Sequence, residues 1–118
     1  MIKLTNLSAD ASFRKLLGQK KINTDYFSIY FGKSLDRNVK NKLNISFIMK
    51  KKIGNSVVRN KIKRRLKSAV RSSLKYKKNI NTNYSYLIFG KTKAYTEKYS
   101  TISNELYKSF FKINQMRK

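Results

Sequence analysis

The sequence predicts a single α+β domain of 118 residues, in which helices and strands follow one another in the order α-β-β-α-β-α. Two segments, 26–31 and 43–49, alternate apolar and polar side chains with the period of two that is typical of β-strands. A long basic segment, 56–76, has apolar residues at helical spacing, and an apolar segment follows at 84–89. A strand, a helix of about 20 residues and another strand predict a βαβ crossover with a parallel pair.

The first predicted element is a short helix between Ser8 and Gly18. Ser8 is a suitable N-cap, and Gly18 is a residue type that often ends a helix. The apolar face of this helix consists of Phe13, Leu16 and Leu17. The polar stretch Lys20–Asp25 that follows is expected to be a connection without regular structure.

The two alternating segments predict strands joined by the loop Gly32–Lys42. In the first strand the core side carries Phe27, Ile29 and Phe31, and the other side carries Tyr26, Ser28 and Tyr30. In the second strand the core side carries Leu43, Ile45, Phe47 and Met49. The residues around 50–53 are a candidate for one further short strand. One face of the sheet is therefore predicted to be buried, and the other to carry amphipathic tyrosines.

The segment Lys50–Lys78 holds 13 of the 29 basic residues of the chain and no acidic residue. Asn55 or Ser56 can cap a helix that runs to about Tyr76. Its apolar stripe consists of Val58, Ile62, Leu66, Ala69 and Ser73, with Val70 at the edge. The opposite arc consists of Lys61, Lys63, Arg64, Lys67, Arg71 and Lys75. One side of this helix is therefore predicted to pack on the sheet, and the other to form a basic surface.

The C-terminal third of the chain predicts a buried strand and a final helix. Tyr84–Phe89 is apolar on both faces, as in the interior strand of a sheet. A helix over 96–113 presents an apolar stripe of Tyr99, Ile102, Leu106, Phe110 and Ile113. Glu97 would lie at the start of this helix, and Lys108 and Lys112 near its end, which suits the helix dipole.

The composition argues against an autonomous catalytic or metal site. The chain has no Cys and no His, so it lacks thiolate nucleophiles, the commonest general base and the commonest metal ligand. The five carboxylates stand singly at Asp10, Asp25, Asp36, Glu97 and Glu105. The sequence shows no apolar run of about 18 residues and no signal peptide, so we expect a cytoplasmic protein without a membrane span.

The excess of 29 Lys and Arg over 5 Asp and Glu gives a formal charge of +24, which predicts a polyanionic partner. A codon bias toward Lys could raise this excess, but it would not obviously lower the number of acidic residues. Nucleic acid is the leading partner class, and an anionic membrane surface is the main alternative. RNA is favoured over DNA because no helix-turn-helix, zinc or zipper pattern is visible, and tyrosines on a sheet face suit unpaired bases.

The segment Lys51–Lys67, KKIGNSVVRNKIKRRLK, resembles the signature of the bacterial ribonuclease P protein component, whose core is Arg-Asn-Arg. The matching positions are Lys52, Gly54, Asn55, Val57, Arg59, Asn60, Lys63 and Arg64. An early helix, the strands at 26–31 and 84–89 and a C-terminal helix also follow the order of the family. The resemblance therefore covers nearly the whole chain, which is treated as one RNA-binding domain over residues 1–118.

The resemblance implies a small mixed sheet in which the basic helix joins two parallel strands by a left-handed crossover. It implies a protein subunit of an RNA-based endoribonuclease, in which the RNA subunit hydrolyses precursor tRNA to remove the 5′ leader. The implied partners are this RNA subunit and the leader, with no membrane and no protein partner. The implied cofactor is Mg²⁺, bound mainly by the RNA subunit, and no organic cofactor is expected. The main alternative is a structural RNA-binding protein such as a ribosomal component.

The resemblance also assigns sites to individual positions. The residues expected to bind the RNA subunit are Lys52, Arg59, Asn60, Lys61, Lys63, Arg64 and Lys67. The residues expected to receive the single-stranded leader are Phe13, Leu17 and Tyr30, to which strand parity adds Tyr26. No catalytic residue and no metal ligand are expected in the protein. The chain departs from the family pattern at Lys61 and Lys67 (usually Arg), at Leu17 (often aromatic) and at 90–92 (often an Arg-Pro pair).

Overall fold

The computed structural model describes residues 3–5, 20–33, 42–77 and 80–116, in which five strands form one mixed sheet. The strands are β1 (Lys3–Thr5), β2 (Lys20–Asn23), β3 (Phe27–Lys33), β4 (Lys42–Ile48) and β5 (Tyr84–Gly90). Their order across the sheet is β1-β4-β5-β3-β2. The pairs β1–β4 and β4–β5 are parallel, and the pairs β5–β3 and β3–β2 are antiparallel. The predicted α+β fold with a small mixed sheet is confirmed.

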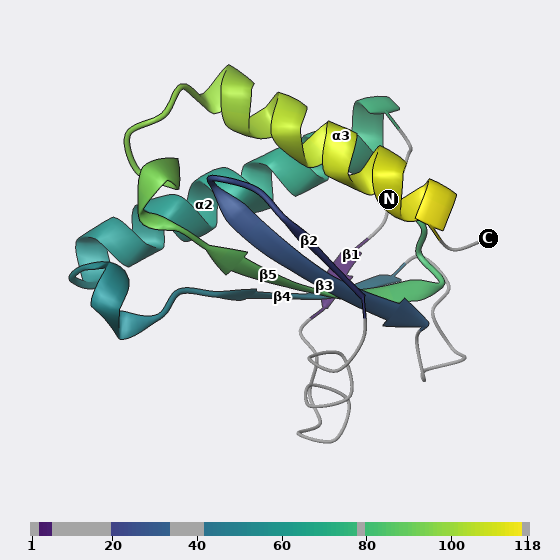
Figure 1. Ribbon diagram of the computed structural model, residues 1–118, viewed down its shortest axis with the longest axis horizontal. Coiled ribbons are helices and arrows are strands. Elements are labelled where there is room, and N and C mark those ends of the chain that lie inside the picture. The colour runs from purple at the N-terminus through teal and green to yellow at the C-terminus, as the bar shows by residue number, and fades with distance from the viewer. Residues whose placement is uncertain (1–2, 6–19, 34–41, 78–79, 117–118) are drawn as a thin grey trace.

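Two long helices cover one face of this sheet (Figure 1). The basic segment forms α2 (Ser56–Ser72) and continues into a π-helical turn, η2 (Ser73–Lys77), close to the predicted end. The final helix is α3 (Tyr99–Met116). Two single 3-10 turns, η1 (Lys51–Ile53) and η3 (Thr92–Ala94), precede α2 and follow β5. The predicted N-terminal helix and the loop 34–41 lie outside the described residues.

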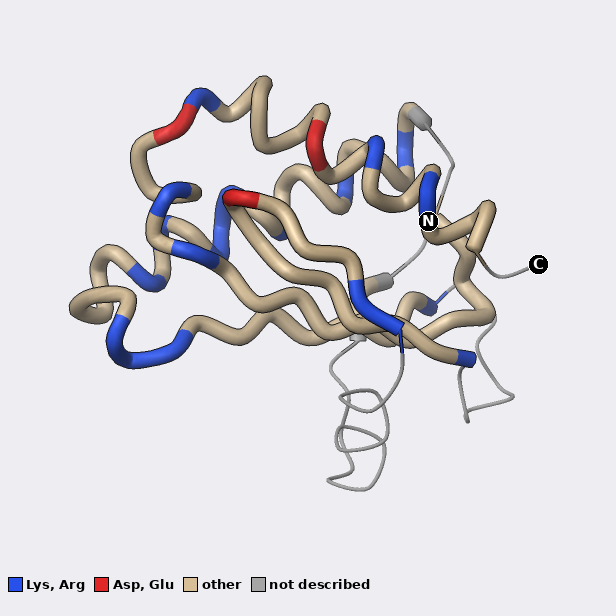
Figure 2. Tube along the Cα trace, in the orientation of Figure 1, with Lys and Arg blue, Asp and Glu red and all other residues tan. Residues whose placement is uncertain are grey.

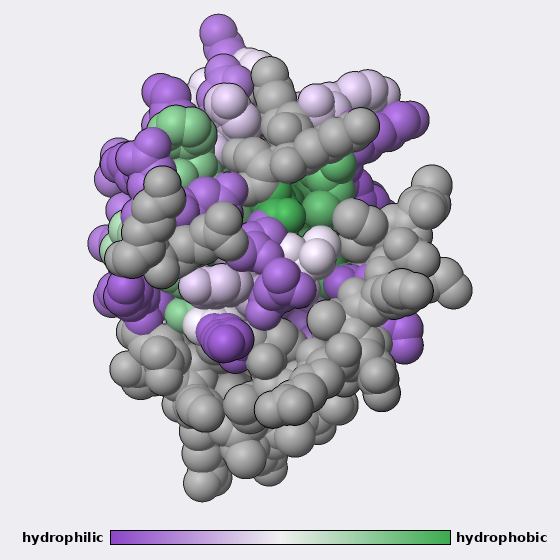
Figure 3. All heavy atoms as spheres, turned by 90° about the vertical axis from the view of Figure 1, so that its right-hand side faces the viewer, coloured by the Kyte–Doolittle hydropathy of each residue, from purple (hydrophilic) through white to green (hydrophobic). Residues whose placement is uncertain are grey.

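The core lies between the two helices and the covered face of the sheet. The core side predicted for the first strand is confirmed, because Phe27, Ile29 and Phe31 of β3 are all buried, although Ser28 on the other side is buried as well. The helices contribute the predicted stripes, of which Ile62, Leu66, Ala69, Val70, Ile102, Leu106, Phe110 and Ile113 are buried. Figure 3, from the right-hand side of Figure 1, shows hydrophobic side chains toward the middle and hydrophilic ones around them.

The connection β4–α2–β5 is the predicted crossover between two parallel strands, with Ile45 opposite Tyr86 in the register. β5 lies in the interior of the sheet between β4 and β3, as its apolar sequence predicts. Gly90 ends β5 under α2, where an added Cβ would collide with the side chain of Met49 and lie 2.8 Å from Cγ2 of Ile62. A side chain at this position would therefore have to displace Met49 and would crowd Ile62 of the basic helix. The left-handed sense of the crossover stays a prediction from the resemblance.

Two local predictions were wrong, and one further element was not predicted. The stretch predicted as a polar connection forms β2, an edge strand antiparallel to β3, in which only Ile22 is half-buried. An edge strand has one paired neighbour and much exposed surface, so it tolerates a polar sequence that gives no alternation signal. β1 is likewise a short edge strand that the sequence did not indicate. The residues 51–53 form the 3-10 turn η1 instead of a strand.

The start of α3 also differs from the prediction, since the helix begins at Tyr99 and the first turn holds no acidic residue. Glu97 precedes the helix, where its carboxylate accepts hydrogen bonds from the Tyr26 hydroxyl at 3.2 Å and from the Lys98 backbone N–H at 3.0 Å. The guanidinium of Arg65 on α2 donates to the backbone carbonyls of Tyr95 and Glu97. These contacts hold the turns that precede α3 against α2, and the helix begins only after them.

The turn after β5, where the family often has Arg-Pro, is held by Lys91. Its backbone N–H donates to the carbonyl of Tyr26 at 3.0 Å. Its ammonium donates to the carbonyl of Thr24 at 2.6 Å and to Oδ1 of Asn23 at 2.5 Å. Lys91 therefore ties the end of β5 to the turn between β2 and β3, and the chain then enters η3.

Candidate nucleic-acid interface

The basic helix α2 begins at a position that the local sequence dictates. Oδ1 of Asn55 accepts the backbone N–H of Val58 at 3.0 Å, so Asn55 is the N-cap and satisfies one of the unpaired donors of the first turn. Gly54, which precedes the cap, has a φ of +157°, a value that residues with a side chain rarely adopt. This pair of residues therefore separates η1 from α2 and sets where the basic face starts.

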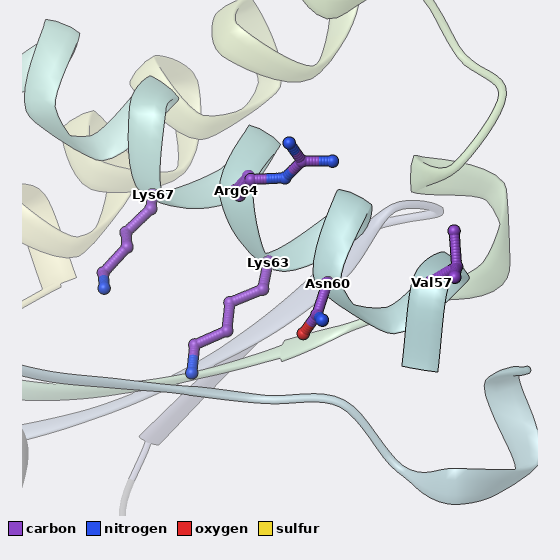
Figure 4. Close-up of a pocket in the computed structure, with 5 residues that line it drawn as sticks. All are labelled: Val57, Asn60, Lys63, Arg64 and Lys67. Carbon is purple, nitrogen blue, oxygen red and sulfur yellow. The ribbon is translucent and has the colours of Figure 1, made fainter. Parts of the chain in front are cut away.

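A surface pocket lies on the exposed side of α2 and is lined by Val57, Asn60, Lys63, Arg64 and Lys67. The spacing of three or four residues places these side chains next to each other on the helix surface. Figure 4 shows Asn60, Lys63 and Lys67 pointing to the same side of α2, while Arg64 extends toward the end of the helix where Val57 lies. We call these five residues the α2 pocket. They combine three cations, an amide and an apolar surface.

The charge of the α2 pocket is not neutralised within the described part of the chain. Lys63 and Arg64 are exposed, and no carboxylate of the described residues forms an ion pair with them. In Figure 2 the acidic residues of the described ranges lie in the β2–β3 turn, before α3 and on α3, and none lies on α2. A helix face with several like charges is destabilised by their repulsion, and a polyanion bound to this face relieves it.

The predicted RNA-subunit residues differ in how much of their side chain is available. Lys52 on η1 and Asn60, Lys63 and Arg64 on α2 are exposed, and Lys67 is half-buried. Arg59 is half-buried, and its Nε donates to the carbonyl of Gly54 at 3.1 Å. Lys61 is exposed, but its ammonium lies 4.5 Å from the centroid of the Tyr95 ring. The structure thus brings four of the predicted positions into the α2 pocket and ties Arg59 and Lys61 to neighbouring groups.

Val57 was missed as a candidate, although the matched motif includes it. Its side chain is 68% exposed, which is unusual for an aliphatic residue on a helix whose other apolar residues pack on the core. The signal that could have identified it is its helical position, three residues before Asn60 and seven before Arg64, on the polar arc. Val57 supplies the α2 pocket with an apolar surface.

The face of the sheet opposite the helices carries a group of aromatic and cationic side chains. The rings of Tyr30 on β3 and Phe89 on β5 meet edge to face, with centroids 5.5 Å apart. The ammonium of Lys21 lies 5.4 Å from the Tyr30 ring centroid, and that of Lys50 lies 5.7 Å from the Phe89 ring centroid. We call these four residues the sheet-face cluster. Half-buried aromatic rings flanked by cations suit the stacking of unpaired bases beside a phosphate backbone.

Tyr26 does not belong to the sheet-face cluster, so the parity that grouped it with Tyr30 was wrong. β3 begins at Phe27, and Tyr26 in the preceding turn packs against the core on the helix side. Its hydroxyl donates to Oε2 of Glu97 at 3.2 Å. Desolvation, together with the nearby carboxylate of Glu97, raises the pKa of Tyr26 above its ordinary value. The other predicted leader residues, Phe13 and Leu17, lie outside the described residues.

The described residues offer no donor set for a protein-held metal ion. They contain no group of three or more His, Cys, Asp or Glu side chains that could ligate one. Mg²⁺ prefers carboxylate oxygens in near-octahedral geometry, which singly placed acids do not supply. Neither described helix has an apolar stretch of the length that a bilayer crossing requires.

Comparison with known proteins shows the family of this chain. The family model for ribonuclease P matches residues 1–114. The RNase P protein from Thermotoga maritima is 18% identical, with a TM-score of 0.73 over 92% of this chain and 96% of that chain. The Staphylococcus aureus RNase P protein is 23% identical, with a TM-score of 0.66 over 92% of this chain and 94% of that one.

The two structural matches show that the fold is shared, and the family match covers nearly the whole chain. A search of curated protein sequences returned no match. The family match selects the ribonuclease P hypothesis over the ribosomal alternative. The chain therefore belongs to the ribonuclease P family and has the role of its protein subunit in tRNA processing.

Proposed function

We propose that the protein binds the ribonuclease P RNA subunit through the α2 pocket and the single-stranded 5′ leader of precursor tRNA through the sheet-face cluster. The observation that carries this proposal is the α2 pocket itself, in which three cations and an amide gather on an exposed helix face. None of the acidic residues that the structure describes belongs to α2 (Figure 2). A surface of this kind is suited to phosphates and to the edges of nucleotides.

The two surfaces suit different forms of RNA. Lys63 and Lys67 point to one side of a straight helix, as contacts to successive phosphates of a folded RNA require. Asn60, which lies beside Lys63 in the α2 pocket, can hydrogen-bond a sugar or a base edge, because it offers both a donor and an acceptor. The sheet-face cluster instead offers aromatic rings, which bind bases that are not already stacked in a duplex. The leader, being single-stranded, is the part of the substrate that meets this requirement.

We place the hydrolysis of the phosphodiester bond in the RNA subunit, with Mg²⁺ bound mainly by that RNA. The lack of a donor set among the described residues supports this assignment. The formal charge of +24 also opposes a cation site on the protein, since like charges raise the free energy of a bound cation. The protein contributes by attracting and orienting two RNA molecules, and its positive charge reduces the number of Mg²⁺ ions needed to offset their repulsion.

Reconstitution with a bacterial ribonuclease P RNA subunit and precursor tRNA tests the proposal at limiting Mg²⁺. We expect the protein alone to cleave nothing, and the RNA with protein to remove the leader at a lower Mg²⁺ concentration than the RNA alone. Cleavage by the protein alone, or a Mg²⁺ dependence that the protein does not change, would contradict the proposal.

Two variants separate the surfaces, and each has a matched control. Lys63→Ala should weaken binding of the RNA subunit, whereas Lys112→Ala removes the same charge from an exposed position of α3 and should not. Tyr30→Ala should reduce the gain in affinity that a leader gives to precursor tRNA, whereas Tyr76→Ala removes a tyrosine outside the cluster and should not. Equal effects of Lys63→Ala and Tyr30→Ala on both RNAs would refute this division.

A further inference from the structure

A second, partly exposed surface borders α2 on the side of α3. It consists of Tyr95 and Tyr99 together with Lys61 and Ser68 of α2, and we call it the tyrosine patch. The Lys61 ammonium lies 4.5 Å from the Tyr95 ring centroid, and Ser68 Oγ lies 3.0 Å from the Tyr99 hydroxyl. Tyr99 was predicted to face the core, but its side chain is 38% exposed.

Arg65 of α2 fixes the position of the backbone that carries the tyrosine patch. Its guanidinium donates to the carbonyl of Tyr95 at 2.8 Å and also to the carbonyl of Glu97. A planar guanidinium that binds two backbone carbonyls fixes the segment before α3 against α2. The two rings are therefore presented by rigid elements, so a ligand that contacts them has little ordering cost to overcome.

The patch adjoins the α2 pocket through Arg64. Arg64 lies three residues after Lys61 and four before Ser68, so the three side chains are neighbours on the helix surface. Figure 4 shows the Arg64 side chain directed away from Lys63 and Lys67. One end of the α2 pocket thus continues into the tyrosine patch.

The charge around the patch is positive. Lys61 and Lys98 are exposed beside the tyrosines, and Arg64 borders them. The Glu97 carboxylate accepts the Tyr26 hydroxyl and the Lys98 backbone N–H. Partly exposed tyrosine rings among cations fit a nucleotide, whose base stacks on a ring while its phosphate meets Lys or Arg.

We propose that the interface with the RNA subunit extends beyond α2 onto the tyrosine patch, where an unpaired nucleotide of that RNA stacks on Tyr99. This inference rests on the proposed function, since it assigns a further contact to the same RNA. Tyr99 provides the ring face, and Lys61 and Arg64 neutralise the neighbouring phosphates. The Tyr95 ring contacts the Lys61 ammonium and so helps to position this cation beside the nucleotide.

The test compares the affinity of Tyr99 variants for a transcript of a bacterial ribonuclease P RNA subunit. Tyr99→Ala should weaken binding about tenfold, in keeping with the loss of one base–aromatic stack. Tyr99→Phe should bind like the unaltered protein, because it keeps the ring and loses only the contact with Ser68. Tyr99→Leu keeps apolar bulk at the helix start, so it is the control for misfolding of the smaller variant. It should lose about as much affinity as Tyr99→Ala, because it also lacks the aromatic ring.

A matched control is Tyr76→Ala, since Tyr76 is 71% exposed and has the Lys75 ammonium 5.3 Å from its ring centroid, but lies in η2. This variant should bind normally. The slope of log affinity against log salt should not change in Tyr99→Ala, because stacking neutralises no phosphate. Equal losses in Tyr99→Phe and Tyr99→Ala would overturn the proposal, since they would assign the effect to the hydroxyl. Unchanged affinity in Tyr99→Ala and Tyr99→Leu would also overturn it.

Arg64→Ala, measured in parallel, separates this proposal from the proposed function. If the unaltered protein does not bind the RNA subunit, the proposed function fails and the tyrosine patch loses its basis. If Arg64→Ala weakens binding and the Tyr99 variants do not, the tyrosine patch alone is refuted.

Discussion

The salt dependence of RNA binding provides a quantitative test of the α2 pocket. We consider a variant in which Lys63, Arg64 and Lys67 are all replaced by alanine. Each phosphate neutralised by a cation contributes about 0.9 to the slope of log affinity against log salt for a duplex nucleic acid. If each of the three pocket cations contacts one phosphate, the pocket accounts for about 2.7 of the total slope. For the unaltered protein this part of the slope corresponds to roughly a 40-fold loss of affinity between 50 and 200 mM salt. The affinity of the triple variant should lack this part of the salt dependence.

The assay is a filter-binding titration of the RNA subunit at several salt concentrations, performed on the unaltered protein and on the triple variant. Alanine has the highest helix propensity, and its introduction removes like-charge repulsion on α2, so the thermal midpoint should stay the same or rise. A slope that is the same in both proteins would refute the assignment, because the α2 pocket would then contact no phosphates.

Three further predictions concern stability and titration. Asn55→Ala should lower the free energy of unfolding by about 1 kcal/mol through loss of the cap, measured by urea denaturation, whereas Asn60→Ala should not. Gly90→Val should cost about 1–3 kcal/mol in the same assay, because its side chain would collide with Met49 and Ile62. The raised pKa of Tyr26 means that the folded protein favours the neutral phenol. The resulting contribution to the free energy of unfolding is fully present below the ordinary tyrosine pKa of about 10, and it is lost as the pH rises through the raised pKa. Tyr26→Phe should therefore remove absorbance change at about 295 nm from the range above the ordinary tyrosine pKa, and a loss confined to the range below it would contradict this assignment.

The elements with strong periodicity were predictable from the sequence. α2 buries one side, and the alternating Phe27, Ile29 and Phe31 of β3 lie in the core, so the pattern of apolar residues gives the type of both elements and their core-facing residues. The Asn55 cap is equally local, because a side chain and a backbone N–H three residues later are enough to form it. The edge strand β2 and the late start of α3 were not predictable, because they depend on pairing with β3 and on Arg65 of α2.

The candidate site also combines features that the sequence predicts with features that only the structure shows. The sequence was sufficient to place Lys63 and Arg64 on the exposed arc of a basic helix. It could not show that Arg59 binds the Gly54 carbonyl, because that contact depends on the turn before the helix. It also could not show that Tyr26 turns toward Glu97, since strand parity fails at a residue that precedes the strand.

The sequence alone determined the charge, the absence of Cys and His and the two-sided character of the long basic helix, because these follow from residue types and their spacing along the chain. Only the tertiary structure decided which cations remain available to a partner and which aromatic rings lie beside them. The physical reason is that such neighbours come from distant parts of the chain: Tyr95 and Tyr99 reach Lys61 and Ser68 across about 30 residues, and Tyr30 reaches Phe89 across the sheet.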